Sequence, residues 1–327
     1  MDVAFGILSS WEGPPAVSQL VDCLASHGSV LIHHDYSKQP DFPRRLPHAY
    51  VIQDFTETGW GSPGFVRAVF HLIRTALERS DFDFFQLLSG SCLPIRPIPD
   101  LKEHLASNGS PIHADVVDLD TDEHVLMSHG HRVFCRADAL AFRLLGRARR
   151  WYLGSNPITI HHASLAISRR AELTANLTAL QWVGRQIHSA ARAGLLNKHP
   201  FRSPVKPFVG SLWFCLRRDV CEFLVQQEQS NPLMPYLLSL NLCDEIVFPT
   251  LLGNSKFAVG ASNHLVNDFV DAHPRVFVDR DLPVLAASSK FFARKFSGDV
   301  NDGTRQTVLR QIEARRKLYM EEAENTL

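Results

Sequence analysis

The sequence predicts an α/β fold whose core is a mostly parallel sheet flanked by helices. Two observations lead to this fold class. Short apolar runs with strand character alternate with helical stretches through the first hundred or so residues. Polar residues follow those runs directly, and the carboxyl ends of parallel strands are where the ligands of such a sheet gather. We also expect a helical insertion in the middle of the chain.

The N-terminal part opens as a β-α-β unit and continues in the same pattern. The expected strands span residues 3–8, 29–33, 50–52 and 82–88, and the expected helices span residues 15–26 and 65–79. Asp35 follows the second strand and Ser89-Gly90-Ser91 follows the fourth. Both therefore belong at the carboxyl edge of the predicted sheet.

The second half of the chain divides into three stretches. Residues 125–205 are rich in His and Arg and lack strong strand patterns, so we expect a helical insertion there. After Pro207 we expect one strand at 209–216 and helices at 218–227 and 244–252. A charged helix at 304–324 has sparse apolar positions that suit packing against the body.

Composition excludes several classes of protein. The 327 residues carry 34 basic and 34 acidic side chains, so no net charge attracts nucleic acid or an anionic membrane. The six cysteines are scattered without a CxxC pair, which favours reduced core thiols. Neither a signal peptide nor the roughly 20 apolar residues of a transmembrane helix is evident. We therefore expect a cytoplasmic protein, working free or at the inner face of a membrane.

Four blocks of residues, in order along the chain, carry a resemblance to a known family. They are Ile32-His33-His34-Asp35, Gly59-Trp60-Gly61-Ser62, Phe84 to Ile95, and a C-terminal set at 210–214, 243–252 and 292–296. Together they resemble the core-2/I-branching β-1,6-N-acetylglucosaminyltransferase family, which also contains the peptide O-xylosyltransferases. The resemblance covers residues 1 to about 100 and 207–297. It implies a GT-A-type glycosyltransferase fold, and the missing anchor points to a bacterial-type member.

The resemblance also suggests how the chain is organised. We assign residues 1–303 to a GT-A-type catalytic domain, with the insertion at 125–205 on its acceptor side. Residues 304–327 then form the C-terminal charged helix. The sequence indicates no oligomeric state.

Glu245 is the candidate general base. A carboxylate at a helix start can simply cap the helix or offset its dipole, which is worth about 0.3–1 kcal/mol. The resemblance instead implies that the Glu of the Asp244-Glu245 pair deprotonates the acceptor hydroxyl, and one carboxylate is what a one-step inverting displacement requires. We assign the capping or supporting role to Asp244.

Arg294 and Lys295 are the candidate grip on the donor diphosphate. Adjacent basic residues are usually a solvated pair, but these two lie between Phe291, Phe292 and Phe296. Apolar anchors of this kind can present fixed cations to a ligand. The resemblance implies that this pair stabilises the charge on the leaving UDP, where two cations can replace a metal ion.

The remaining candidate site residues are expected to hold the nucleotide or the sugar. They are Asp35, Trp60, Gly61, Ser89, Gly90, Ser211 and Trp213. Trp60 and Trp213 are core aromatics by default. Both adjoin glycines in the matched blocks, where a ring can form a flat wall while the backbone approaches closely. Asp35 resembles the nucleotide-contacting Asp of the family.

We expect no metal and no cofactor. Many transferases of this architecture hold Mn²⁺ with an Asp-x-Asp motif after the fourth strand, but Ser89-Gly90-Ser91 occupies that place. Asp-x-Asp does occur elsewhere, at 81–83, 118–122 and 279–281, and such short matches arise easily by chance. Only Asp118 to Asp122 is kept as a rival metal site.

Histidine is abundant, with 16 residues and local groups at 33–34, 129–131 and 161–162. None of these groups has the His-Glu-x-x-His spacing of a zinc hydrolase. We interpret them as structural or as contacts to the acceptor.

The sequence therefore predicts an inverting, metal-independent transferase that moves a sugar from a UDP-sugar to a glycan or glycolipid of a bacterial surface polymer. UDP-N-acetylglucosamine is the first donor candidate, UDP-xylose the second, and UDP-glucuronic acid stays open. Leu212 stands where xylosyltransferases tend to have a polar residue. The alternatives are a metal-dependent transferase using Asp118 or Asp120, and a glycan-binding protein that kept the fold without turnover.

Overall fold

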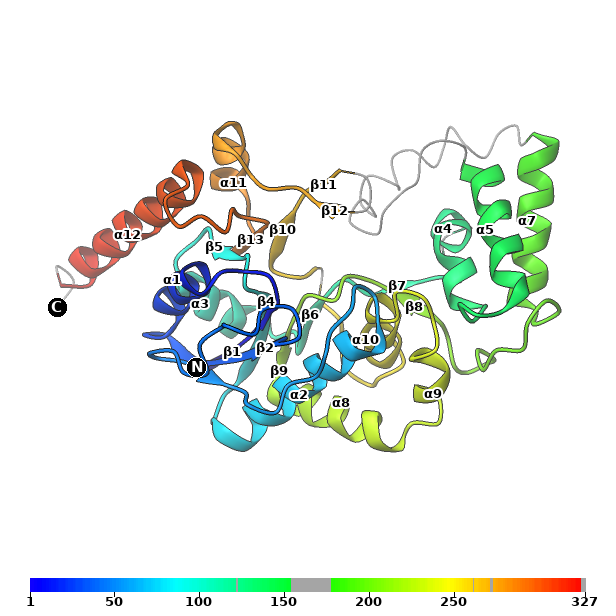
Figure 1. Ribbon diagram of the computed structural model, residues 1–327, viewed down its shortest axis with the longest axis horizontal. Helices are drawn as coiled ribbons and strands as arrows, with labels where there is room; N and C mark the ends of the chain where they lie inside the picture. Colours follow the sequence, from blue (N-terminus) through cyan, green and yellow to red (C-terminus); the bar gives the residue numbers. More distant parts are fainter. Residues whose placement is uncertain (122, 154–177, 261, 271–272, 325–327) are drawn as a thin grey trace.

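The computed structural model describes residues 1–121, 123–153, 178–260, 262–270 and 273–324 (Figure 1). A central sheet with helices on both faces forms the body. A group of helices from the middle of the chain lies at one end of the molecule, and the C-terminal helix extends from the other.

The central sheet has six strands in the order β3-β2-β1-β4-β9-β6. Their bounds are β1 Val3–Ser9, β2 Gly28–His34, β3 Tyr50–Val51, β4 Phe84–Ser89, β6 Ile112–Ala114 and β9 Phe214–Arg217. The first four strands in this order run parallel, and β9 runs antiparallel to both β4 and β6. The mostly parallel sheet predicted from the sequence is confirmed.

Helices cover both faces of this sheet, as predicted. The covering helices are α1 Pro14–Leu24, α2 Pro63–Arg79, α3 Ile98–Asn108, α8 Arg218–Ser230 and α10 Asp244–Gly253. Aromatic rings pack between the sheet and the helices α2 and α10. The ring centroids of Phe214 in β9 and Phe248 in α10, for example, are 5.4 Å apart. On the opposite face α1 and α3 lie side by side, both lining one groove.

A small second sheet, with the order β10-β13-β5, lies beside the first. Its strands are β5 Leu93–Pro94, β10 Leu265–Asn267 and β13 Phe292–Arg294. β13 is the middle strand, parallel to β10 and antiparallel to β5. Because β5 follows β4 after one short turn, β13 is brought close to the carboxyl end of β4.

Most of the described residues of the predicted insertion are helical, as expected. They form α4 Glu123–Val133, α5 Leu140–Leu153 and α7 Ala179–Arg192, which pack together (Figure 1). Residues 154–177, with His161 and His162, lie outside the described residues. The acceptor-side role of this group stays a prediction.

The single strand expected at 209–216 is wrong. Two strands occupy this stretch, β8 Phe208–Val209, which pairs with β7 Val117–Asp118, and the central strand β9. The chain leaves one ladder and joins another because Gly210 passes against the backbone: a Cβ at Gly210 would lie 1.7 Å from the carbonyl oxygen of Asp115. Residues 209–216 are mostly apolar, so their hydrophobic pattern does not reveal that the strand is interrupted.

The remaining elements lie in the C-terminal third. They are α9 Met234–Leu237, the hairpin β11 Phe269–Val270 with β12 His273–Pro274, the short helix η2 Asp279–Asp281, α11 Leu282–Ala287 and α12 Gly303–Glu324. The C-terminal helix α12 is confirmed, and its first turn docks on α1 through the fully buried Arg305, which donates to the carbonyl oxygen of Ala16 at 2.7 Å.

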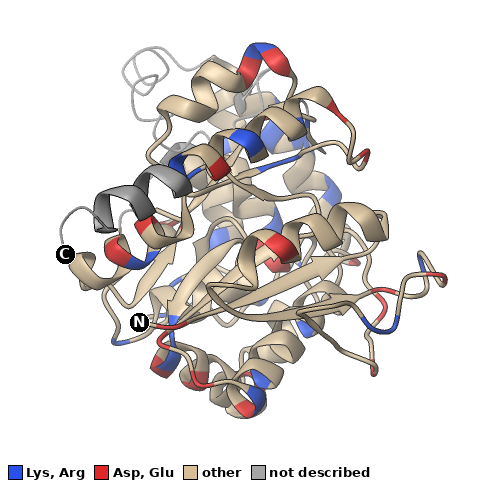
Figure 2. Cartoon of the chain, turned by 90° about the vertical axis from the view of Figure 1, so that its left-hand side faces the viewer, with Lys and Arg blue, Asp and Glu red and all other residues tan. Residues whose placement is uncertain are grey.

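Charge, thiols and hydropathy agree with the sequence analysis. Acidic and basic residues are interspersed on the face shown in Figure 2. All six cysteines are free thiols, five of them buried. Within the described residues, no helix combines the length and the apolar character needed to cross a membrane.

Candidate donor and catalytic site

A pocket of about 620 Å³ opens at the carboxyl edge of the central sheet. The ends of β1, β2 and β4 contribute to its floor, the turn at 58–60 forms part of its wall, and the end of β13 with the residues after it closes another side. A parallel sheet places ligands at this edge. The pocket therefore combines chain segments from both ends of the sequence.

Six of the predicted site residues line this pocket, and five do not. The lining residues are Trp60, Ser89, Gly90, Trp213, Arg294 and Lys295. The others are Asp35, Gly61, Ser211, Asp244 and Glu245, which lie behind or beside it in the positions described below.

Arg294 is held from two sides. Its Nε donates to the hydroxyl of Ser89 at 3.1 Å, and its guanidinium carbon lies 4.9 Å from the ring centre of Trp213. Burial lowers the pKa of Arg294, while the charges of Cys92 and Glu12 act in the opposite direction. A guanidinium stays protonated and has four further N–H donors, so this group offers a fixed cation to the pocket.

Lys295 is exposed, and the aromatic residues around the pair are anchored in the core as predicted. Phe291, Phe292 and Phe296 are at most 3% exposed. Because β13 pairs with strands on both sides, the two cations project from a backbone that is fixed by its neighbours. Arg294 and Lys295, which are adjacent in the sequence, thus offer two cations to the same pocket, and Lys295 is the more exposed of the two.

Asp35 lies behind the pocket and supports its wall. One carboxylate oxygen accepts from the backbone and hydroxyl of Ser37, and the other accepts from the backbone and hydroxyl of Thr58 at 2.7 and 2.6 Å. Burial raises the pKa of Asp35, but the hydrogen bonds from Ser37 and Thr58 outweigh it and lower the pKa. Since Thr58 lines the pocket, Asp35 positions that turn.

Trp60 and Gly61 connect the pocket to the start of α10. The indole of Trp60 is 71% exposed, which leaves a ring face accessible at the pocket rim. Gly61 has φ +64, and a Cβ there would lie 2.2 Å from Leu242. Only glycine suits this left-handed position at close approach. The carbonyl of Gly61 accepts from the amide of Cys243, the residue before α10.

Ser211 and Trp213 connect the pocket to the same helix from the other side. The backbone amide of Gly210 donates to the carbonyl of Glu245 at 3.0 Å. Ser211 accepts from the amide of Trp213 at 3.4 Å, which helps to turn the chain toward the pocket. The start of α10 is thus held between two pocket-forming segments.

Glu245 lies in the first turn of α10, and its carboxylate is paired with a cation from the insertion. Arg132 of α4 donates from Nη1 to Glu245 Oε2 at 2.8 Å, and its Nη2 lies 2.6 Å from His129 Nδ1. The Glu245 side chain is 27% exposed, against 9% for Arg132. The ion pair holds a carboxylate that solvent can still reach.

The capping role predicted for Asp244 is wrong. The N-cap of α10 is Cys243, and the helix has no side-chain cap. Asp244 is half-buried, one of its oxygens is buried without a hydrogen-bond partner, and its pKa is raised to about 7, first by burial and second by the charge of Glu245. An N-cap side chain belongs to the residue just before the helix and accepts from the free amides of the first turn. Asp244 is one residue too late in the chain for this role.

The carboxylates of the rival metal site are paired with cations. Asp118 accepts from Lys206 at 2.9 Å, and Asp120 forms an ion pair with Arg192 at 2.7 Å. Neither carboxylate lines the donor pocket, and Asp122 lies outside the described residues.

Several pocket residues were missed by sequence reasoning. They are Glu12, His33, Lys38 and Thr58. Glu12 lies three residues after the end of β1, so its place near the carboxyl edge of the sheet was a usable signal. Arg132 was missed as well, and no local pattern connects it to Glu245 because 113 residues separate them.

Comparison with family models finds a match over residues 10–129 to the family described as "Branch: Core-2/I-Branching enzyme". This confirms the resemblance inferred from the sequence and, with the largely parallel sheet, the GT-A-type fold. The matched segment includes Asp35, Trp60 and Ser89 but not Glu245 or Arg294. Comparison with curated proteins finds no match.

The raised pKa of Asp244 predicts a pH-dependent effect on stability. Between its usual value of 3.8 and about 7 the folded state keeps a proton that the unfolded state has released, so the free energy of unfolding falls as pH rises through this range. Asp244→Asn has no carboxyl group to titrate at this position, so its free energy of unfolding should not show this decrease. In melting curves, the stability of the variant relative to the parent should increase from about pH 5 to about pH 8. A capping carboxylate has a lowered pKa, so its replacement would give no change in relative stability over this pH range.

Proposed function

We propose that this glycosyltransferase of the Core-2/I-Branching type moves a sugar from a UDP-sugar to an acceptor hydroxyl, with inversion and with no metal at the diphosphate. The observation that carries the proposal is the position of Arg294. This guanidinium is fixed between Ser89 and Trp213 at the carboxyl edge of the sheet, and Lys295 adjoins it in the same pocket.

The leaving group explains why fixed cations matter. When the bond between the anomeric carbon and the diphosphate oxygen breaks, negative charge develops on UDP. A preorganised Arg and Lys can stabilise this charge without reorganising during the reaction. The nucleotide and sugar then occupy the rest of the pocket, where Trp60 and Trp213 offer aromatic surfaces.

Glu245 acts as the general base. The acceptor hydroxyl oxygen attacks the anomeric carbon from the face opposite UDP, the hydroxyl proton passes to the Glu245 carboxylate, and the glycosidic bond forms as the diphosphate leaves. Arg132 occupies Oε2 of that carboxylate, so Oε1 is the oxygen for the proton. Inversion of an α-linked UDP-sugar yields a β-linked product.

The donor sugar is proposed to be N-acetylglucosamine, with xylose second, and the acceptor a glycan or glycolipid. Leu212 does not decide between the two sugars, because its side chain is 4% exposed and does not line the pocket. Its apolar character is accounted for by core packing.

The diphosphate grip is tested by removing each cation. Arg294→Ala and Lys295→Ala should each weaken UDP binding by about 1.5–3 kcal/mol, the scale of a charge-assisted hydrogen bond. Calorimetry with UDP and with uridine separates diphosphate contacts from base contacts, and uridine affinity should hold. Arg280→Ala, an exposed arginine outside the pocket, is the control of equal charge. Parental UDP affinity in both site variants would place the diphosphate elsewhere.

The base is tested by Glu245→Gln. The amide keeps the size of the carboxylate and can still accept from Arg132, but it cannot take a proton, so single-turnover transfer should fall by roughly 100-fold or more while UDP affinity holds. Glu222→Gln is a matched control, since that glutamate also pairs with an arginine but is exposed and lies in α8 rather than at the start of α10. Transfer at the parental rate in Glu245→Gln would remove this residue from the mechanism.

Metal independence is tested by comparing UDP binding and transfer with EDTA and with added Mn²⁺. Both should be the same in the two conditions, and Asp118→Asn should behave as the parent because Asp118 pairs with Lys206 outside the pocket. Activity that requires Mn²⁺ and is lost in Asp118→Asn would establish the metal-dependent alternative instead.

A further inference from the structure

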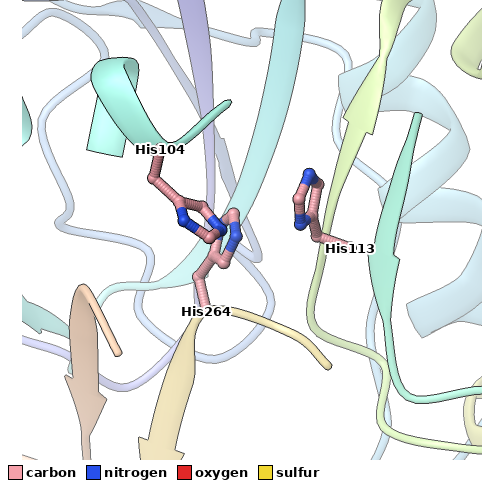
Figure 3. Close-up of side chains that lie close together, drawn as sticks. All are labelled: His104, His113 and His264. Carbon is pink, nitrogen blue, oxygen red and sulfur yellow. The ribbon is translucent and has the colours of Figure 1, made fainter. Parts of the chain in front are cut away.

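Three histidines from distant parts of the chain meet on the face of the central sheet that α3 covers (Figure 3). His104 comes from α3, His113 from β6, and His264 from the residue before β10. One ring nitrogen from each lies within 4.8 Å of the corresponding nitrogen of the other two. None of the three lines the donor pocket.

The strand register explains why His113 faces this cluster. His113 pairs with Cys215 of β9, and Cys215 pairs with Gln86 of β4. Directly opposed residues in neighbouring strands point to the same face of a sheet. Gln86 and His113 therefore share one face, and the His264 ring lies over it, with Nδ1 3.1 Å from Gln86 Oε1.

The surroundings of His264 determine its tautomer. The amide nitrogen of Gln86 donates to the carbonyls of Leu87 and Phe214, so the amide oxygen of Gln86 is the group that faces His264. An oxygen can only accept, and His264 Nδ1 must therefore carry the proton. That leaves a lone pair on His264 Nε2, which is buried without a hydrogen-bond partner.

His113 is in a similar state. Its Nε2 is buried without a hydrogen-bond partner, and the ring as a whole is 2% exposed. The ring centroids of His113 and His264 are 4.6 Å apart, and those of His104 lie 5.6 and 5.5 Å from them. Buried polar atoms without partners are uncommon, and two of them in one cluster require an explanation.

Burial favours the neutral form of all three rings. Burial lowers the pKa of His264 to about 2 and that of His113 to about 4, and it also lowers that of His104. Lys290 near His264 and Arg96 near His104 act in the same direction. Neutral imidazole is the form that binds a metal.

We propose that His104, His113 and His264 bind a zinc ion at a structural site separate from the donor pocket. Imidazole nitrogens bind Zn²⁺ at about 2.0–2.1 Å in tetrahedral geometry, which places ligand atoms roughly 3.3 Å apart, and a water molecule would complete the four-coordinate shell of a site with three histidines. The Gln86 oxygen then supports His264 from the second shell, which is the usual partner of a zinc-bound imidazole.

The position of His264 indicates what the ion would stabilise. The carbonyl of His264 accepts from the amides of Phe291 and Phe292, at the start of the strand that ends in Arg294. A metal bonded to His113 and His264 would therefore fasten the small sheet to the central sheet. The site would stabilise the strand that carries the diphosphate grip without touching the donor.

The test uses the full chain and zinc itself. The protein is freed of metal, exposed to Zn²⁺, passed over a chelating resin and measured by elemental analysis, and its melting temperature is recorded with and without zinc. The parent should retain stoichiometric zinc and melt at a higher temperature when zinc is bound. No retained zinc together with an unchanged melting temperature would overturn the proposal.

His104→Gln is the informative variant, because this partly exposed helix residue can be replaced with less risk to folding. Zinc affinity should fall by more than about 100-fold, the upper end of the cost of losing a mere supporting partner. His71→Gln, a partly buried histidine outside the cluster, should retain zinc. Equal zinc retention in His104→Gln and the parent would place the ion elsewhere. Zinc content and melting temperature are both measured without UDP, so the outcome does not depend on the proposed transfer reaction.

Discussion

The contact between Arg294 and the end of β4 is the interaction on which the site depends. Arg294 belongs to the small C-terminal sheet, whereas Ser89, its hydrogen-bond acceptor, ends a strand of the central sheet. Burying a guanidinium is costly unless it is hydrogen-bonded, so this bond constrains where the small sheet can lie. The pocket exists because the two sheets meet there, with Trp213 packed against the same guanidinium.

The candidate base depends on a second long-range constraint. The first turn of α10 is tied to the pocket through Gly61 on one side and Gly210 on the other. Arg132 reaches it from the insertion and holds the Glu245 carboxylate. An insertion that is separate in the sequence thus contacts the candidate base directly.

The histidine cluster and the diphosphate grip lie at opposite ends of one pair of strands. His264 precedes β10 and bonds to the start of β13, and Arg294 is the last residue of β13. Such a short strand pair is marginally stable by itself. Anchoring at both ends, by Ser89 at one and by the histidines at the other, would explain how a small sheet presents cations in a fixed position.

The sequence by itself determined the mostly parallel sheet, its covering helices, and several of the pocket residues that lie at strand ends. These follow from periodicity and from local blocks such as Ser89–Ser91, and the cations at 294 and 295 were found in the same way. Tertiary structure alone decided the break at Gly210, the supporting role of Asp35 and the burial of Asp244. It also decided the pairing of Glu245 with Arg132 and the meeting of three histidines. Each of these depends on groups far apart in the chain, and hydrophobic periodicity carries no information about which distant side chain will face a given one.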